Sequence, residues 1–419
     1  MQQNKILVIV LNRFTNDNRV LRQSRTLASA GTDVSVFALH EDQLPLREEI
    51  APLHVRRFPL VTRSWSRNRI IQLFKYLECV LRMTLAGARL KPDAIHANDL
   101  NALPVGYCIA RLTGAKLVYD SHELWSDPMH RKIFPKWMFS IGVRMERALA
   151  RRCDAVMAAS PGYSREMAKS MGIPAPAVIR NLPVSAEVLC SLGTGMTPGA
   201  QWSPLHSDLG LDRSVPLILH LGQMGAGRGL ETFLRAMGQV APPAVAVFLG
   251  GGASAYREGL RSLAEGLGIG KRVFFHDPVP PVDIYRYAAG ATIGVALIES
   301  ACLSYRYTLP NKTFEYLHGG LPVVASDIPE MAAVVRDYKV GELFHEGDCR
   351  ELADVINKLL VSPEQLAYYR QMSFLAAQEL TWSKESPKLL QIYERLLSGE
   401  PSRDHSIKIS NSAKANSTG

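Results

Sequence analysis

Short runs of apolar, often β-branched residues alternate with longer amphipathic stretches along most of this 419-residue chain. Such runs, continuous rather than alternating with polar residues, are typical of parallel strands that helices cover on both faces. The pattern therefore predicts an α/β protein built on doubly wound parallel sheets. The expected strands are residues 6–10, 34–38, 54–58, 94–96, 116–120 and 155–159, and then 217–221, 246–250, 273–275, 293–297 and 323–326.

The alternation stops between residues 181 and 215, a stretch rich in Gly, Pro, Ser and Thr. It predicts a linker or surface insertion at 186–214, between a first domain at 1–185 and a second at 215–384. We expect two Rossmann-like domains that face each other across a deep cleft, since open α/β sheets bind ligands at the carboxyl ends of their strands. A last helical pattern covers about 385–398, and the polar residues 399–419 are expected to be disordered.

The composition favours a soluble cytoplasmic protein. The six cysteines are far apart and form no Cys-x-x-Cys pair, which favours reduced thiols over a disulfide framework or a zinc site. The first apolar run is cut short by Arg13 and Asp17, so it does not resemble a signal peptide. No uncharged apolar run approaches the ~20 residues that a membrane span needs.

Positive charge is concentrated in the first half of the chain. Residues 1–190 carry 27 Lys and Arg against 16 Asp and Glu, and residues 191–419 carry 21 against 23. Basic residues are interleaved with large apolar ones at 56–91 and again at 131–152. This mixture suits an anionic membrane surface, and a solvated basic face over ordinary core helices is the alternative. No zinc-finger, RNP or helix-turn-helix pattern accompanies it, so nucleic acid is not expected as a partner.

A glycine-rich turn follows the expected strand at 217–221. Glycine at positions 222, 225, 227 and 229 lets the backbone approach a phosphate, and Arg228 can fork onto its oxygens. The spacing differs from the Gly-x-Gly-x-x-Gly fingerprint, which makes an NAD site the weaker interpretation.

A second motif lies at residues 308–326. Pro310 stands where a helix starts and Gly319 where it stops, before a buried strand. The helix N-terminus suits a phosphate, Lys312 adds a positive charge, and Glu315 can accept hydrogen bonds from a diol such as a ribose. These groups suit a sugar nucleotide, while solvated helix residues remain the alternative.

Polar residues follow two neighbouring strands of the first half. His96 and Asp99 come at the end of one, and Asp120, His122 and Glu123 at the end of the next. Because parallel strands end at one edge of a sheet, these side chains are expected to form a site there. A metal site is not expected, since no Asp-x-Asp pair offers its usual carboxylates.

With these motifs the chain resembles the retaining GT-B glycosyltransferases of family 4, from about residue 5 to residue 397. The resemblance rests on residues 222–229 and 310–324 and on the strand ends at 96–99 and 122–123. The turn at 16–20, together with 119–124 and 310–312, is similar to a bacterial branch that assembles polysaccharides or glycoconjugates.

The resemblance implies a role for each motif. Arg228 and Lys312 neutralise the donor diphosphate, Glu315 binds the ribose, and His122 faces the transferred sugar. Transfer then proceeds with retention and without a metal, by front-face departure of the nucleotide, with the β-phosphate taking the acceptor proton. The first domain, 1–185, is then the acceptor domain and the second, 215–384, the nucleotide-sugar donor domain. The final helix crosses back to the first domain. The other residues expected at the donor site are Gly222, Gln223, Gly225, Gly227, Asn311, Tyr307, Asp99 and Glu123.

Three positions and one stretch depart from the family pattern. Tyr307 stands where the family often has a glutamate that contacts the donor sugar, so the identity of that sugar is left open. Gln223 replaces the usual arginine of the glycine turn, and Arg228 replaces its lysine. A stretch at 12–18 replaces the Gly-Gly pair of the first loop.

The sequence thus predicts a glycosyltransferase that uses a UDP- or GDP-linked sugar and no other cofactor. The expected acceptor is a lipid-linked or growing glycan, at the cytoplasmic face of an anionic membrane. Two alternatives stay open: a sugar-nucleotide epimerase on the same scaffold, and a degenerate transferase-like partner subunit. Base recognition is expected from backbone near 276–281, and the oligomeric state is not specified.

Overall fold

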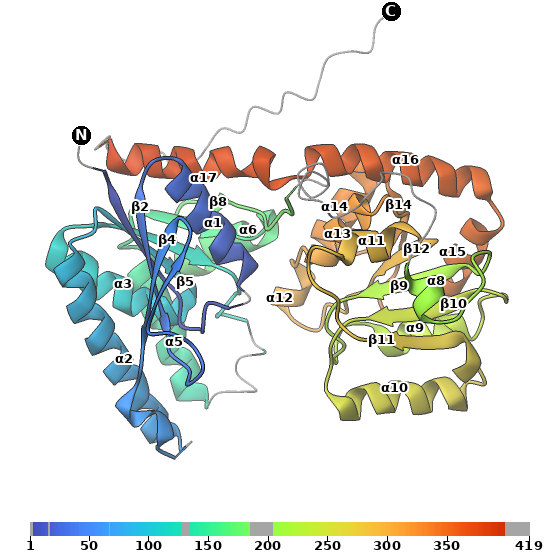
Figure 1. Ribbon diagram of the computed structural model, residues 1–419, viewed down its shortest axis with the longest axis horizontal. Coiled ribbons are helices and arrows are strands. Elements are labelled where there is room, and N and C mark those ends of the chain that lie inside the picture. Colours follow the sequence, from blue (N-terminus) through green and yellow to red (C-terminus); the bar gives the residue numbers. More distant parts are fainter. Residues whose placement is uncertain are drawn as a thin grey trace, which may run out of the picture. The chain divides into compact units, whose positions relative to one another are not determined.

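The computed structural model describes residues 3–15, 17–66, 68–127, 129, 135–184 and 204–398. The chain forms two compact units, Met1–Ile179 with Ser386–Gly419, and Arg180–Glu385. Each is built on one largely parallel sheet with helices packed against it (Figure 1), which confirms the predicted fold class of two Rossmann-like α/β domains.

The first sheet has the order β3-β4-β2-β1-β5-β6-β7-β8. All neighbours are parallel except β3, which forms an antiparallel hairpin with β4. The central position of β1 brings the ends of β2, β4, β5 and β6 to one edge. The strands are β1 Lys5–Ile9, β2 Asp33–Leu39, β3 Arg47–Ile50, β4 Leu53–Phe58, β5 Ala94–Asn98, β6 Lys116–Ser121, β7 Ala155–Ala158 and β8 Ala177–Val178.

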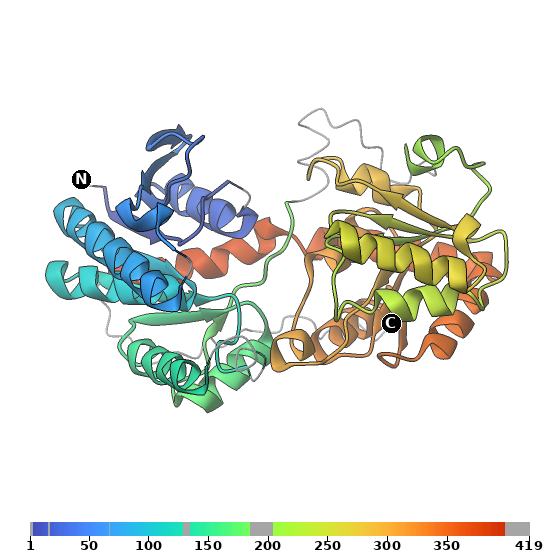
Figure 2. The ribbon, with the colours of Figure 1, turned by 90° about the horizontal axis from the view of Figure 1, so that it is seen from below.

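Helices cover both faces of this sheet (Figure 2). The glycines of α2 and α3 pack against Leu7 and Ile95, whereas α1 and α17 contact the opposite face at His96 and Asp120. Helix α17 begins in the second unit, and its residues from 386 onward belong to the first. The helices are α1 Asn18–Ser29, η1 Val61–Ser64, α2 Arg69–Leu90, α3 Asp99–Thr113, α5 Lys136–Ala150, α6 Pro161–Met171 and α17 Trp382–Leu397.

The second sheet is parallel throughout, in the order β11-β10-β9-β12-β13-β14. Alternate residues of β9 face two separate cores, with Leu219 in the cluster under α13 and Ile218 in the cluster under α9. The strands are β9 Leu217–Leu221, β10 Val245–Leu249, β11 Val273–His276, β12 Ile293–Ala296, β13 Val323–Ser326 and β14 Gly341–Phe344. The helices are α8 Pro204–Asp208, α9 Leu230–Met237, α10 Ser254–Gly266, η2 Gly270–Arg272, α11 Ile284–Ala289, α12 Leu303–Arg306, α13 Asn311–His318, α14 Pro329–Tyr338, α15 Cys349–Leu360 and α16 Pro363–Glu379.

Every predicted strand is present, and β3, β8 and β14 are additional. Of the stretch expected as a linker, residues 185–203 lie outside the described part. Within 204–214, α8 inserts Leu205, fully buried, into the core of the second unit, and Leu209 and Leu211 pack against that core, while residues 212–214 are exposed. Residues 399–419, the expected disordered tail, also lie outside the described residues. Within the described ranges, no helix combines the length and the apolar character needed to cross a bilayer.

Candidate active site

The loop after β9 packs closely against the loop after β10. The Gly222 N–H donates to the Leu249 carbonyl oxygen over 2.9 Å, and a Cβ on Gly250 would lie 2.1 Å from the Gly222 oxygen. Only glycine fits so close an approach. Gly227 has a φ of +75°, and a Cβ there would lie 2.8 Å from the Tyr305 ring. The glycine-rich turn is thus fixed by its backbone rather than by side chains.

Two polar side chains border this turn. Arg228 is half-buried, and its Nε lies 4.0 Å from the place that a Cβ on Gly225 would take. Gln223 is exposed, and its Oε1 lies 3.3 Å from the equivalent point on Gly251. The guanidinium therefore folds over its own turn, while the amide reaches the neighbouring one.

Helix α13 carries Lys312 into the second unit's interior. The side chain is only 5% exposed, and among the described residues no group accepts a hydrogen bond from its Nζ. Burial and then the Arg228 charge lower the pKa of Lys312 to about 7, against an opposing effect of Glu315. An unpaired buried ammonium is costly, so its presence points to an anion that completes the site.

Glu315 lies one turn further along α13 and is half-buried. Burial raises its pKa to about 7, against the lowering effect of Lys312. The two groups therefore titrate in the same range. The pKa values of both groups respond to any charge that a ligand brings between Arg228 and α13.

His220, on β9, is a third nitrogen group near this position that the sequence did not single out. It is fully buried, and neither ring nitrogen has a hydrogen-bond partner among the described residues. Burial, followed by the charges of Lys312 and Arg228, holds the pKa of His220 well below its usual range. His220 is therefore neutral. No motif could have revealed it, because it reads as an ordinary strand position.

Asn311 and Tyr307 flank the start of α13. The Asn181 amide donates to Asn311 Oδ1 over 3.0 Å, which ties this helix to the segment after β8. The Tyr307 N–H closes α12 on the Leu303 carbonyl over 3.1 Å. Both predicted residues thus belong to the second unit, with Gly222, Gln223, Gly225, Gly227, Arg228, Lys312 and Glu315.

The first unit holds a separate cluster around His122. Asp99, in a left-handed conformation with φ of 64°, accepts the His122 backbone N–H over 2.9 Å and lies 3.3 Å from its Nδ1. The Asp120 carboxylate lies 3.3 Å from Nε2. Burial would lower the pKa of His122, but Asp99 and Asp120 raise it to about 10. The ring is therefore a cation at neutral pH, held between two carboxylates.

Asp120 is completely buried and fully bonded. Arg19 binds both of its oxygens, at 2.7 Å and 3.1 Å, and the Gln23 amide donates to it over 2.9 Å. Against the effect of burial, Arg19 and His122 hold the pKa of this carboxyl well below its usual range. Asp120 thus joins α1 to the end of β6.

A histidine and a tyrosine extend this network to the last helix. His96 Nε2 lies 3.6 Å from Asp120, and His96 Nδ1 shares a hydrogen bond of 2.8 Å with the Tyr393 hydroxyl of α17. Glu123, also predicted for the site, has an exposed side chain, and its carbonyl oxygen accepts the Ser121 hydroxyl over 2.9 Å. The cluster thus contains His122 and Asp99, with Glu123 beside it.

Comparison with known proteins assigns the family. The model of the glycosyl transferase 4-like domain matches residues 17–181, and that of the glycosyl transferases group 1 matches residues 215–362. D-inositol 3-phosphate glycosyltransferase of Xylanimonas cellulosilytica is 24% identical over 399 residues, which is 92% of each chain. The chain is a family-4 GT-B glycosyltransferase. The predicted family is therefore confirmed, and with it the class of nucleotide-sugar-dependent transferases.

Solved structures show the same fold. Sucrose-phosphate synthase of Thermosynechococcus elongatus has a TM-score of 0.78 at 19% identity, covering 94% of this glycosyltransferase and 100% of that chain. HepE of Anabaena, solved in complex with UDP-glucose, has a TM-score of 0.70 at 20% identity, with 94% and 99% covered.

Proposed function

We propose that this glycosyltransferase binds the diphosphate of a UDP- or GDP-linked sugar between the glycine turn and the start of α13. The observation that carries this is the buried Nζ of Lys312, which has no partner among the described residues and lies near Arg228. Cationic donors and helix N-termini are the groups that stabilise phosphate charge. A diphosphate supplies the negative charge that pairs with Lys312, and it thereby keeps this lysine protonated.

Glu315 then binds the ribose hydroxyls. A half-buried carboxylate whose pKa is raised to about 7 carries a proton part of the time. Once the diphosphate holds Lys312 as a cation, the carboxylate form is favoured, and a carboxylate accepts hydrogen bonds from both hydroxyls of a diol.

Transfer proceeds with retention, and the positive charge that the departing diphosphate needs comes from Arg228 and Lys312. The β-phosphate takes the proton of the attacking hydroxyl on the same face. His122 serves as a fixed cation near the transferred sugar rather than as a base, because both of its nitrogens face carboxylates and its pKa is raised to about 10.

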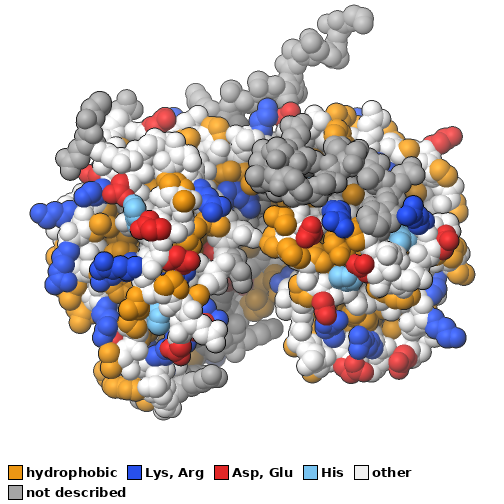
Figure 3. All heavy atoms as spheres, viewed as in Figure 1, with side chains coloured by type: hydrophobic (Ala, Val, Ile, Leu, Met, Phe, Trp, Pro, Cys, Tyr) orange, Lys and Arg blue, Asp and Glu red, His pale blue; other side chains and the backbone are white. Residues whose placement is uncertain are grey.

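The acceptor is a lipid-linked or growing glycan at the cytoplasmic face of an anionic membrane. An apolar stripe on α2 supports this: Leu73, Leu77, Leu81 and Leu85 recur every four residues, and all are about half exposed. On α5, Trp137 and Ile141 are exposed one turn apart. Hydrophobic side chains gather over the start of α2, with basic ones along it (Figure 3). Apolar anchors beside Lys and Arg suit an anionic bilayer surface.

Titration calorimetry tests the donor site. We expect one nucleotide among UDP, GDP and their common sugar conjugates to bind, and NAD, as the control, not to bind. Arg228→Ala and Glu315→Ala should abolish transfer in a folded protein. Failure of every nucleotide to bind the folded enzyme would contradict the proposal and favour the degenerate partner subunit. Release of epimerised donor without acceptor would favour the epimerase.

Sedimentation with vesicles tests the membrane surface. The wild-type enzyme should pellet with anionic vesicles and stay in solution with neutral ones, and Leu77→Ser with Leu81→Ser should reduce the bound fraction. Val361→Ser, at a position 82% exposed in the second unit, is the control. Equal binding to both vesicles would contradict this part of the proposal.

A further inference from the structure

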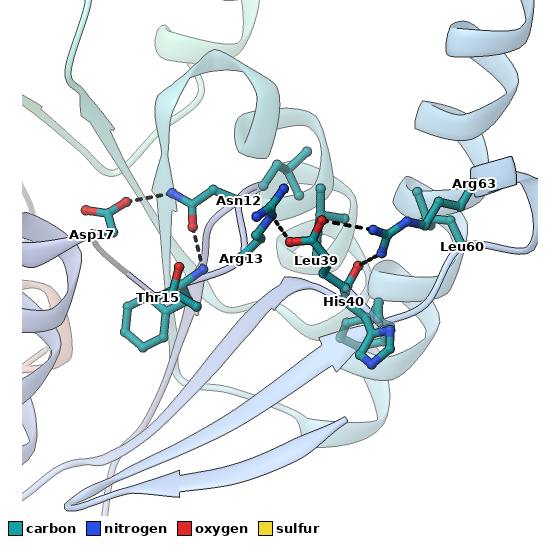
Figure 4. A pocket seen from close by; sticks show the side chains of 12 residues that line it. Asn12, Arg13, Thr15, Asp17, Leu39, His40, Leu60 and Arg63 are labelled. Atoms are coloured by element: carbon teal, nitrogen blue, oxygen red, sulfur yellow. Dashed lines mark hydrogen bonds and ion pairs between the residues drawn. The ribbon is translucent and has the colours of Figure 1, made fainter. Parts of the chain in front are cut away.

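A pocket with a volume of about 610 Å³ opens at the carboxyl ends of β1, β2 and β4 in the first unit (Figure 4). None of the motif residues assigned above to donor binding lines it. Its volume is within the range of small-molecule sites, ~300–1,000 Å³. Its walls come from the loops after three neighbouring strands, so the sheet itself fixes their spacing.

The floor of the pocket is apolar. Phe14 and Phe58, which are 4% and 5% exposed, lie beneath it, and Leu11, Leu39 and Leu60 also line it. Aliphatic side chains above buried rings give a ligand an apolar surface to pack against. A strongly charged ligand gains little from such a floor.

The rim carries charges that cancel one another. The Glu41 carboxylate pairs with both Arg13 and Arg63, at 3.1 Å from an Arg63 nitrogen, and Arg63 also donates to the His40 carbonyl oxygen over 2.6 Å. On the other side, Asp17 accepts the Asn12 amide over 2.8 Å (Figure 4). The two guanidinium groups thus share the Glu41 carboxylate, and the Asp17 carboxylate lies across the pocket beside Asn12. The pocket offers planar donors and acceptors without a net charge, which suits a ligand with many hydroxyls and no charge.

Phe14 is held in an unfavourable backbone conformation. Its φ is +53°, which is rare for a bulky side chain, and its N–H donates to Asn12 Oδ1 over 2.8 Å. Strain of this kind collects at ligand sites, where the surrounding structure maintains it. Here the strained residue is one that lines the pocket.

We propose that this pocket binds an uncharged sugar ring of the acceptor glycan, beyond the sugar that reacts near His122. This rests on the proposed function. The pocket lies over β4, β2 and β1, while Asp99 and His122 follow β5 and β6 of the same sheet. From β2 to β6 is three strand spacings, about 14 Å, which is longer than one sugar ring. The acceptor is therefore an oligosaccharide, and the pocket selects its distal residue.

Two variants at the rim test this against a matched control. Glu41→Ala and Arg63→Ala remove the paired planar groups, whereas Asp42→Ala removes the neighbouring carboxylate, which is 86% exposed, lies 4.0 Å from an Arg63 nitrogen and does not line the pocket. Binding is followed by saturation-transfer NMR with uncharged methyl glycosides and their di- and trisaccharides. Inorganic phosphate is the charged probe.

We expect saccharide signals in the wild type and in Asp42→Ala, and their loss in both rim variants. With oligosaccharide acceptors, the KM should rise at least tenfold in the rim variants, with an unchanged kcat. The melting temperature and the nucleotide affinity measured by calorimetry show whether each variant is folded. Equal saccharide binding in Glu41→Ala and Asp42→Ala would overturn the proposal, as would displacement of the saccharide by phosphate. Failure of the donor site appears separately, as absent nucleotide binding in the wild type.

Discussion

The polar clusters of the two units are built in opposite ways. In the first unit, Asp120 is completely buried and its oxygens are bonded to Arg19 and Gln23. In the second, Lys312 is nearly as buried, yet its Nζ has no acceptor among the described residues. A buried charge without a partner is costly to a fold. The first cluster is therefore complete as a framework, whereas the second, in its described part, lacks an acceptor for Lys312, as the proposed donor site requires.

The largest effect is expected from breaking the complete cluster. Asp120→Ala leaves the Arg19 guanidinium buried without its carboxylate, and should lower the free energy of unfolding by about 3–5 kcal/mol. Denaturant unfolding measures this. The control is Asp277→Ala, whose exposed carboxylate pairs with Arg257 and should change stability by at most about 1 kcal/mol. Similar losses in both variants would mean that the buried cluster is no framework.

The incomplete cluster should respond in the opposite direction. Lys312→Met replaces a buried ammonium by an apolar chain of similar length, so the free enzyme should become more stable by about 1–3 kcal/mol. Nucleotide affinity should fall about 10- to 100-fold, since one charged hydrogen bond contributes about 1.5–3 kcal/mol. Calorimetry measures the nucleotide affinity, and thermal unfolding measures the stability. Lys271→Met, at an exposed position of the same unit, is the control. Unchanged nucleotide affinity would refute the assignment.

The same cluster predicts how the stability of the free enzyme depends on pH. Folding raises the pKa of Glu315 from 4.5 to about 7. The folded chain therefore binds more protons in that interval, and the free energy of unfolding falls as the pH rises through it. Folding lowers the pKa of Lys312 from 10.5 to about 7. The unfolded chain therefore binds more protons than the folded one above pH 7, and the free energy of unfolding rises as the pH rises above 7. The two together predict a minimum near pH 7.

Thermal unfolding between pH 5 and pH 9 measures this minimum. It should disappear in the double variant Lys312→Met, Glu315→Gln, which titrates at neither position. A saturating nucleoside diphosphate should also remove it, because the phosphates keep Lys312 protonated. A minimum that survives in the double variant would assign it to other groups.

The sequence predicted the sheets well because parallel strands are apolar throughout. It missed β3, whose residues Arg47–Ile50 are mostly charged, because an edge hairpin needs no buried face. It also treated 204–214 as a linker, although Leu205 of α8 lies in the core. Local composition does not report which partner a short segment finds.

For the site, motifs pointed to Arg228, Lys312 and His122, because strand ends and helix starts are local features. The Arg19–Asp120 pair joins residues 101 positions apart, and the His96–Tyr393 bond joins residues 297 apart. Such pairings depend on the topology. The unpaired state of Lys312 depends on burial, which follows from packing and not from the residue's own neighbours in sequence.

The smallest effect is expected where the last helix meets the complete cluster. Tyr393→Phe removes one hydroxyl and leaves His96 Nδ1 without its 2.8 Å partner, which should cost about 0.5–1.5 kcal/mol of stability. Tyr369→Phe, which removes a 3.0 Å bond to Glu342 in the second unit, is the matched control. Because His96 lies 3.6 Å from Asp120, which faces His122, Tyr393→Phe should also shift the pH profile of kcat/KM, and Tyr369→Phe should not. Equal stability losses with identical profiles would show that α17 only packs on the first unit, and a shift in Tyr393→Phe alone would make Tyr393 a positioning residue for His122.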